Sequence, residues 1–171
     1  MPPPPNWPDH VAYLSACVYH SSVSNETRAF LDGGSKSIST QKPTVVTIRR
    51  ISSSDHPACG QFGLFAARKI LANEHLLDYI GEIHCDERDD SDYDLSLWRG
   101  GEINVGIDAS VRGNEGRFIN DYRGIHEKPN AMFVDTRAPS GELRMEVKSS
   151  RLIKKGEEIT VSYGKGWWQA R

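Results

Sequence analysis

Short stretches of alternating or β-branched apolar residues, separated by turns, dominate the chain from Lys42 onward. Such stretches, bounded by polar clusters, are typical of strands. We expect strands over Thr44–Arg50, Gly63–Ala67, His75–Ile83, Asn104–Asp108, Met132–Asp135, Leu143–Val147 and Ile159–Ser162. No helical period persists beyond about three turns, and no repeat of solenoid length occurs. The pattern predicts a β-rich α+β fold of small sheets.

The first 41 residues follow a different pattern. Five of the nine prolines lie in Pro2–Pro8, which we expect to be extended. Asp9–Tyr19 is predicted as a short helix, with Asp9 as its cap. Thr27–Leu31 predicts one helical turn within a polar loop. We place a boundary near Gln41, between an N-terminal arm (1–41) that packs on the domain and a main domain (42–171).

Composition places the chain among globular proteins of one domain. Of its 171 residues, 37% are hydrophobic and 26% are charged. The net charge of -2 lacks the basic footprint of a non-specific nucleic-acid binder, although a protein that binds a basic tail remains compatible with it. No apolar run approaches the ~20 residues that span a bilayer, and the start lacks a secretory signal pattern. We therefore expect no direct nucleic-acid binding and no membrane partner, and we leave the oligomeric state open.

The cysteines indicate a reduced intracellular protein. Cys17, Cys59 and Cys85 are odd in number and include no Cys-x-x-Cys pair. His56 and Cys59 are spaced like half of a zinc site, but no second half with ligand spacing exists. We expect no metal.

Two separated motifs carry the candidate chemistry. The stretch from Arg112 to Asn130 contains Arg-Phe-Ile-Asn and ends in Pro-Asn, and the stretch from Gly156 to Tyr163 reads Gly-Glu-Glu-Ile-Thr-Val-Ser-Tyr. Four weaker elements precede them in order: Cys59-Gly-Gln-Phe-Gly-Leu-Phe-Ala, Tyr79-Ile-Gly-Glu, Tyr93-Asp-Leu-Ser-Leu and Ile107-Asp-Ala-Ser. Each motif alone also fits a buried strand or a polar turn, whereas the set in this order is far more specific.

Read together, these elements resemble the SET-domain lysine methyltransferases over roughly residues 42–168. The acidic linker after the Tyr-x-Gly strand, and an Arg-Phe-Ile-Asn without a following His-Ser-Cys, look most like the plant enzymes that add one methyl to a lysine of the histone H3 tail. The resemblance implies small sheets with a C-terminal segment threaded through a pseudoknot-like crossing. It also implies S-adenosylmethionine as cofactor, S-adenosylhomocysteine as product, and a histone tail or other basic peptide as substrate. The expected compartment is then the nucleus, with the cytoplasm left open.

The resemblance also implies roles for individual residues. Tyr163 would place its hydroxyl at the methyl-transfer point, and Tyr79 would line the lysine channel, although a core tyrosine explains either residue alone. Gln61 stands where the family has glycine, and Asp121 where it usually has histidine. The cofactor-binding set that the resemblance implies is Gln61, Phe62, Gly63, Leu64, Tyr93, Arg117, Phe118, Asn120, Asp121 and Tyr163. For Tyr93, a place in the strand core is the alternative.

Many family members carry a cysteine-rich zinc module after the last motif, but this sequence has no cysteine beyond Cys85. Trp167 and Trp168 are the available aromatic cover for the adenine, because an indole face stacks well on a base. A terminal tryptophan pair that caps the core is the alternative.

Methyl transfer from a sulfonium requires a neutral lysine, whose free pKa is about 10.4. A narrow apolar channel and the sulfonium charge both disfavour the ammonium form. The acidic run Asp86–Asp94 and Glu82 favour a basic peptide through electrostatic steering, although a solvated acidic loop is the alternative. Two other functions stay open: a SET-like binding module without catalysis, and a methyltransferase of a non-histone protein.

Overall fold

The computed structural model describes residues 1–34, 43 and 45–165, and this part of the chain consists mainly of short strands. The elements, in chain order, are β1 (Ala12–Tyr13), β2 (Val18–Tyr19), α1 (Asn25–Asp32), β3 (Val46–Arg50), β4 (Phe62–Ala66), β5 (His75–Asp78), β6 (Glu82–His84), β7 (Asp94–Gly100), β8 (Ile103–Asp108), β9 (Arg112–Gly113), the 3₁₀ turn η1 (Glu115–Phe118), β10 (Asn120–Asp121), β11 (Ala131–Arg137), β12 (Leu143–Ser149) and β13 (Thr160–Val161). The predicted β-rich fold of small sheets is confirmed. Within the described residues, no helix is both long and apolar enough to cross a membrane.

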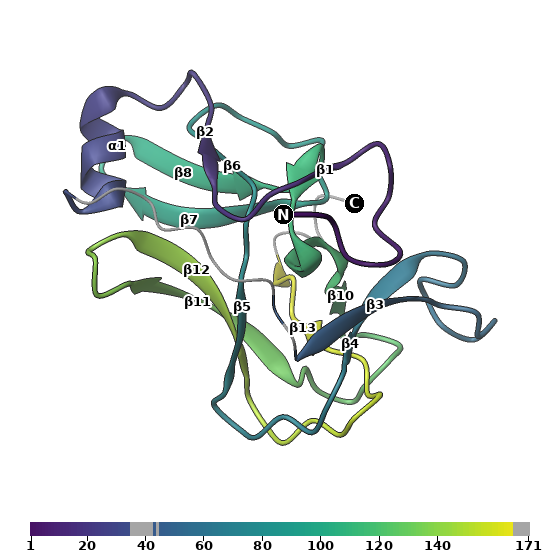
Figure 1. Ribbon diagram of the computed structural model, residues 1–171. Coiled ribbons are helices and arrows are strands. Elements are labelled where there is room, and N and C mark those ends of the chain that lie inside the picture. The colour runs from purple at the N-terminus through teal and green to yellow at the C-terminus, as the bar shows by residue number, and fades with distance from the viewer. Residues whose placement is uncertain (35–42, 44, 166–171) are drawn as a thin grey trace.

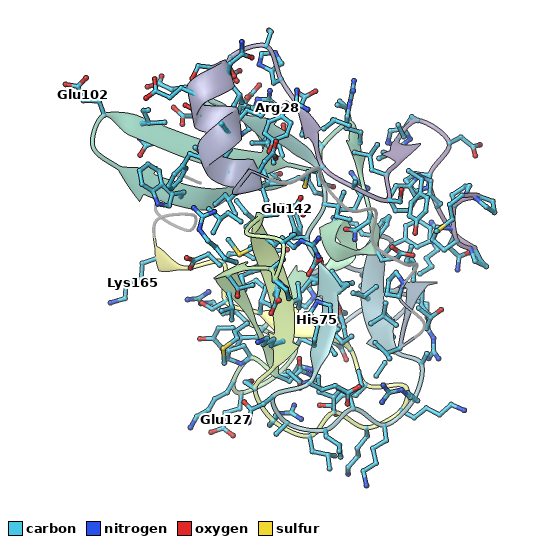
Figure 2. All side chains as sticks on the ribbon, turned by 60° about the vertical axis from the view of Figure 1, so that its left-hand side comes forward. Arg28, His75, Glu102, Glu127, Glu142 and Lys165 are labelled. Carbon is cyan, nitrogen blue, oxygen red and sulfur yellow. The ribbon has the colours of Figure 1, made fainter. Side chains whose placement is uncertain are left out.

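Two sheets form the body of the molecule. A four-stranded sheet in the order β2-β6-β8-β7 lies in the upper half of Figure 1, with α1 beside it, and a three-stranded sheet in the order β11-β12-β5 lies below it. The hairpin of β3 and β4 stands to one side of both. Charged side chains such as those of Glu102 and Glu127 project outward from the loops (Figure 2).

The core consists of two apolar clusters. One joins the β3–β4 hairpin, η1 and the C-terminal segment, with Leu64 and Val161 fully buried. The other joins the four-stranded sheet to β12 and includes Leu31 from α1. Phe133 on β11 packs against both clusters and so joins them.

The single strand predicted over His75–Ile83 is wrong, because the chain leaves one sheet and enters another at this point. β5 belongs to the three-stranded sheet and β6 to the four-stranded sheet. The buried side chain of Asn114 holds the break: its Nδ2 donates to the carbonyl of Asp78 at 2.7 Å, and its Oδ1 accepts from the Ile80 amide at 3.2 Å. Gly81 is needed next to the break, since a Cβ there would lie 2.4 Å from the Asp108 carbonyl oxygen. The other six predicted ranges each contain a strand.

The helix predicted over Asp9–Tyr19 is also wrong. This segment forms the two-residue strands β1 and β2, which pair in parallel with β9 and β6. Its backbone groups bond to other strands instead of closing helical turns, so tertiary pairing overrides the local pattern. The helical turn predicted over Thr27–Leu31 is confirmed as α1, which the Ser24 side chain caps by accepting from the Thr27 amide at 3.1 Å.

Residues of the N-terminal arm contact both core clusters. The Trp7 ring packs edge-on against Tyr13 and Phe118, with centroid distances of 4.9 and 5.6 Å. The Tyr13 hydroxyl donates to the buried carboxylate of Glu115 at 3.0 Å. Leu31 is 1% exposed. The predicted division of the chain near Gln41 lies outside the described residues and stays a prediction.

The C-terminal segment runs between β4 and β10. On one side, the Ile159 amide donates to the Leu64 carbonyl at 2.8 Å, and Glu158 forms an isolated bridge with Phe65. On the other side, β13 pairs in parallel with β10. The segment therefore threads between elements that precede it by about 40 to 100 residues, as the predicted crossing requires.

Asn130 fastens this threaded segment. The side chain is fully buried, its Nδ2 donates to the Glu158 carbonyl at 2.7 Å, and its Oδ1 accepts from the Thr160 amide at 2.8 Å. The backbone amide of Asn130 donates to the Thr160 carbonyl at 3.2 Å. One amide side chain thus satisfies two backbone groups at the centre of the crossing.

Leu31→Ala should show that the arm is part of the folding unit. Removing a fully buried leucine side chain costs about 2–5 kcal/mol. Urea denaturation should show that loss in one cooperative transition, whereas Glu26→Ala, at an exposed position of the same helix, should change the free energy of unfolding by less than about 0.5 kcal/mol. A separate low-urea transition that alone responds to Leu31→Ala would show that the arm folds independently.

Asn130→Ala should lower the free energy of unfolding by about 3 kcal/mol, because the Thr160 amide and the Glu158 carbonyl lose their buried partner together. Urea denaturation monitored by tryptophan fluorescence measures the change. A loss below about 1 kcal/mol would mean that the crossing is held elsewhere.

Candidate functional site

Two hollows meet at Tyr163. The first hollow has a volume of about 510 Å³ and lies between the arm, the β3–β4 loop, η1 and β10. The second hollow has a volume of about 420 Å³ and lies between the β6–β7 connection, β7 and β11. Both volumes fall in the ~300–1,000 Å³ range of small-molecule sites. Their shared wall consists of Asp92, Tyr93, Arg117 and Tyr163.

Most of the predicted cofactor residues lie together around the first hollow. Its lining includes Gln61, Phe62, Tyr93, Arg117, Phe118, Asn120, Asp121 and Tyr163. Gly63 and Leu64 do not line it: Leu64 is a core residue with no exposed surface, and Gly63 lies behind the wall against Asn120. Trp167 and Trp168 lie outside the described residues, so their predicted role as a cover stays a prediction.

Arg117 is the central cation of the shared wall. Its Nε donates to the Ala109 carbonyl at 2.9 Å, which fixes the guanidinium plane. The guanidinium carbon lies 4.3 Å from the ring centroid of Tyr93 and 5.1 Å from that of Phe118. Tyr93 is 37% exposed, so its alternative place in a strand core is excluded. The pair offers a positive charge and a flat aromatic face to both hollows.

Asp121 anchors the final motif. Its carboxylate accepts from the backbone amide of Tyr163 at 2.8 Å and from the Arg123 guanidinium at 2.9 Å. The acidic residue at this position is therefore satisfied by local donors. The Asp121 carboxylate thereby fixes the backbone of Tyr163, and Asp121 also lines the first hollow.

The hydroxyl of Tyr163 is held in place by a backbone group. It donates to the Ile119 carbonyl at 2.6 Å, which fixes the position of the phenolic oxygen. Burial, with a further contribution from the Asp121 charge, raises the pKa of Tyr163 well above its usual value. The side chain is therefore a neutral phenol throughout the physiological range and does not act as a base.

Tyr79 forms the inner end of the second hollow. Its hydroxyl donates to the Tyr93 carbonyl at 2.6 Å, and its ring packs edge-on against Phe133 at 5.7 Å. Burial raises the pKa of Tyr79 as well, so it too remains a phenol. Tyr79, Phe133 and Tyr163 thus contribute aromatic surface to a hollow whose other lining residues are mostly polar.

The acidic run divides between two roles. Arg88 folds back onto Glu82 and Asp108, with N–O distances of 2.9 and 3.0 Å, so Glu82 is neutralised within the fold. Asp89, Asp92 and Asp94 line the second hollow together with Arg88, Arg99 and Arg117, and Asp94 bonds His84 at 2.8 Å. The predicted attraction of a basic peptide stays a prediction.

Sequence reasoning missed several lining residues of the first hollow. Pro8 and His10 come from the arm, and Pro57 and Ala58 from the loop between β3 and β4. No motif marks them, because loops from distant parts of the chain meet only in the folded state. The sequence marks only His56 in this loop, as half of a possible zinc site. In the structure, His56 bonds Glu158 at 2.7 Å instead.

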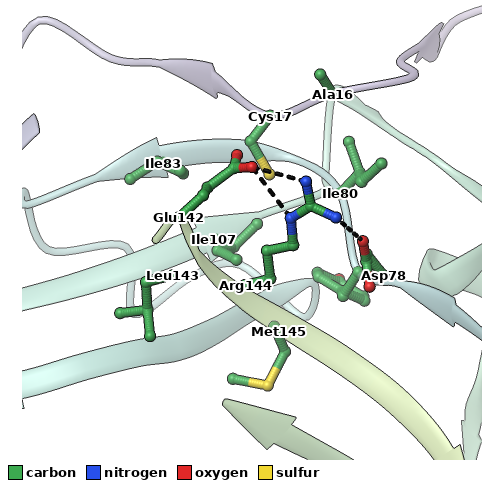
Figure 3. A pocket seen from close by; sticks show the side chains of 11 residues that line it. Ala16, Cys17, Asp78, Ile80, Ile83, Ile107, Glu142, Leu143, Arg144 and Met145 are labelled. Atoms are coloured by element: carbon green, nitrogen blue, oxygen red, sulfur yellow. Dashed lines mark hydrogen bonds and ion pairs between the residues drawn. The ribbon is translucent and has the colours of Figure 1, made fainter. Parts of the chain in front are cut away.

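A third cavity is too small for a ligand. It measures about 20 Å³, enough for roughly one water molecule, and is lined by Cys17, Ile80 and the ion pairs of Arg144 with Asp78 and Glu142 (Figure 3). Burial raises the pKa of the Cys17 thiol to about 12, which disfavours the thiolate form that acts as a nucleophile.

One group in the described part of the chain has the spacing of metal ligands: His75, Asp78 and Glu146 lie within 4.8 Å of one another. Each has a protein partner, since Asp78 binds both His75 and Arg144, and Glu146 pairs with Lys148. We assign no metal there, and the expected absence of a metal stays a prediction.

The combined evidence of fold and sequence defines the class. The sequence profile of the SET domain matches residues 61–164, more than half of the chain, and the chain belongs to the SET-domain family. It is similar to histone-lysine N-methyltransferase ASHH3 of Arabidopsis thaliana, with 32% identity over 117 residues, covering 61% of this chain and 30% of that protein.

A second relative is the H3 lysine-36 specific histone-lysine N-methyltransferase of Eremothecium gossypii, with 39% identity over 113 residues. That match covers 60% of this chain and 15% of the relative, so the chain spans only a minor part of both proteins. Among solved structures, ATXR5 in complex with histone H3.1 mono-methylated on R26 shares the fold. Its TM-score is 0.66 at 19% identity, over 91% of this chain and 82% of that one.

Asp121→Ala should lower the free energy of unfolding by about 2 kcal/mol, because the Tyr163 amide and Arg123 both lose a charged acceptor. Asp121→Asn keeps an acceptor oxygen and should lose less than half as much. Urea denaturation of both variants provides the measurement, and equal losses would argue against the anchoring role of the carboxylate.

Proposed function

We propose that this chain is an S-adenosylmethionine-dependent protein-lysine N-methyltransferase that acts on a histone tail, with histone H3 favoured. The main structural support for this proposal is that two hollows of ligand size share a wall that includes Tyr163. Family membership and the names of the relatives support the same reaction. Histones are nuclear, so we propose the nucleus as the compartment.

The first hollow suits the cofactor by its chemistry. S-adenosylmethionine supplies an electrophilic methyl group on a sulfonium, next to an amino-acid end that carries an amine and a carboxylate. Asn120 and Asp121 line the hollow with an amide and a carboxylate. Arg117 and Arg123 line it with guanidinium groups. Phe62 and Phe118 add apolar surface, with ring centroids 6.1 Å apart. This chain therefore presents partners for each part of such a ligand.

The second hollow suits a lysine side chain. Tyr79, Phe133 and Tyr163 are among its lining residues, and burial of a lysine against aromatic rings disfavours the ammonium and lowers the lysine pKa. The proton leaves before transfer, and the protonated phenols of Tyr79 and Tyr163 cannot accept it at neutral pH. We propose that it leaves to solvent through the second hollow.

The residues of the shared wall align the reaction. The lysine nitrogen forms a bond to the methyl carbon while the carbon–sulfur bond breaks, and the positive charge moves from sulfur to nitrogen. Holding the reacting atoms in line supplies most of the acceleration. The Tyr163 oxygen, fixed by its bond to Ile119, is placed to accept weak C–H···O contacts from a methyl group at this wall.

Two outer strands of the described sheets lie beside the second hollow. β7 and β11 are the outer strands of their sheets in the described fold, and Leu95 and Phe133 from these strands line the hollow. An extended peptide can add to such an edge through main-chain hydrogen bonds. Asp89 and Asp92 would attract the basic residues of a histone tail.

Incubation with core histones and isotopically labelled S-adenosylmethionine, followed by mass spectrometry of the peptides, tests the proposal. We expect a methylated lysine in the H3 tail. Cofactor binding by calorimetry without transfer to any histone or cell-extract protein would indicate a binding module. Methylation of a non-histone protein alone would retain the reaction and change the substrate.

Tyr163→Phe should reduce the methylation rate at least about tenfold, which corresponds to ~1.4 kcal/mol of transition-state stabilisation. The ring remains, so the affinity for S-adenosylhomocysteine should change little and stability should fall by only about 1 kcal/mol. Tyr19→Phe is the matched control, since it removes a hydroxyl that bonds Asp32 outside both hollows. An unchanged rate in Tyr163→Phe would mean that this tyrosine has no part in transfer.

A further inference from the structure

Glu158 lies behind the first hollow at a point where four side chains meet. It is 6% exposed, and its carboxylate contacts Asn120 Nδ2 at 2.8 Å and His56 Nε2 at 2.7 Å. Its backbone carbonyl accepts from Asn130 Nδ2 at 2.7 Å and bonds His126 Nε2 at 3.1 Å. A carboxylate this buried is costly unless it has hydrogen-bond partners, and these contacts supply them.

The contact fixes which way the Asn120 amide faces. One Nδ2 hydrogen goes to Glu158 Oε1, and the other points to the Phe62 carbonyl at 3.4 Å. Both donors of the side chain are thereby used within the protein. The acceptor Oδ1 is the polar atom that remains for the first hollow, which Asn120 lines.

His56 completes the arrangement from the opposite side of the carboxylate. The Ala58 amide donates to His56 Nδ1 at 3.0 Å, so Nδ1 carries no proton. The proton is on Nε2, which donates to Glu158 Oε2. One imidazole therefore holds both the buried carboxylate and the turn that brings Pro57 and Ala58 into the wall.

Two glycines leave the space that this arrangement needs. A Cβ on Gly63 would lie 2.8 Å from Glu158 Oε1 and 3.2 Å from Asn120 Nδ2. Gly124 has φ +80°, and a Cβ there would lie 2.6 Å from Pro57 Cγ. A larger residue in place of Gly63 would displace the Glu158 carboxylate, and one in place of Gly124 would displace the loop at Pro57.

We propose that His56 is a positioning residue for cofactor recognition: through Glu158 it holds the Asn120 amide with its oxygen available to the amine of the cofactor's amino-acid end. This inference rests on the proposed function. Asn and Gln amides are nearly symmetric in shape, so without the carboxylate the Asn120 amide would be free to turn a donor toward that amine.

Two substitutions distinguish the bond of His56 to Glu158 from its bond to the Ala58 amide. In His56→Gln, the amide nitrogen reaches about as far as Nε2 and keeps a donor for Glu158. In His56→Asn, the oxygen can accept from the Ala58 amide, but no donor reaches Glu158. Calorimetry with S-adenosylhomocysteine should show at least about tenfold weaker binding for His56→Asn and a change within about threefold for His56→Gln.

A double-mutant cycle with Asn120→Ala distinguishes positioning from general support of the fold. If His56 acts through Asn120, adding His56→Asn to Asn120→Ala should weaken binding by less than about twofold further. His75→Asn, which breaks a histidine–carboxylate contact of 2.9 Å outside both hollows, should leave binding unchanged.

Equal affinities in folded wild type and His56→Asn would overturn the positioning role while leaving the proposed function intact. Additive losses in the cycle would overturn it as well, because the effect would not pass through Asn120. A folded wild-type chain that binds neither S-adenosylmethionine nor S-adenosylhomocysteine overturns the proposed function, and this inference falls with it.

Discussion

The arrangement of the molecule depends on the buried amide of Asn130. The C-terminal segment has only a two-residue strand of its own, and strand pairing that short does not hold a chain in place. Asn130 supplies the missing bonds from a position some 30 residues earlier. The lining of both hollows follows from this crossing, because Tyr163 stands two residues after β13 and Glu158 two residues before it.

The structure explains how the chain accommodates Asp121 and Gln61, the two residues that depart from the family pattern. The acidic Asp121 takes its partners from the Tyr163 amide and Arg123, so a charge in this place strengthens the local backbone. Gln61 is exposed at the rim of the first hollow, and Gly63 provides the close approach to Asn120.

The sequence predicted the strands well where pairing is local. The β3–β4 and β11–β12 hairpins were found because each strand pairs with its neighbour in the chain. The helix over Asp9–Tyr19 and the single strand over His75–Ile83 were wrong, since distant partners decide the conformation there. For the site, eight of the predicted cofactor residues line the first hollow, Gly63 and Leu64 do not, and the assigned roles stay predictions. The walls formed by Pro8, His10, Pro57 and Ala58 could not be predicted, because no local pattern encodes which loops meet.

The shared wall of the two hollows has a consequence for turnover. In the proposed reaction, the cofactor and the peptide occupy separate hollows and are present together, so the kinetics should be sequential, without a covalent intermediate on the protein. With separate hollows, the proposed cofactor has a way out that does not require the peptide to leave. Repeated transfer to one bound peptide would then require room beside Tyr79, Phe133 and Tyr163 for a larger amine.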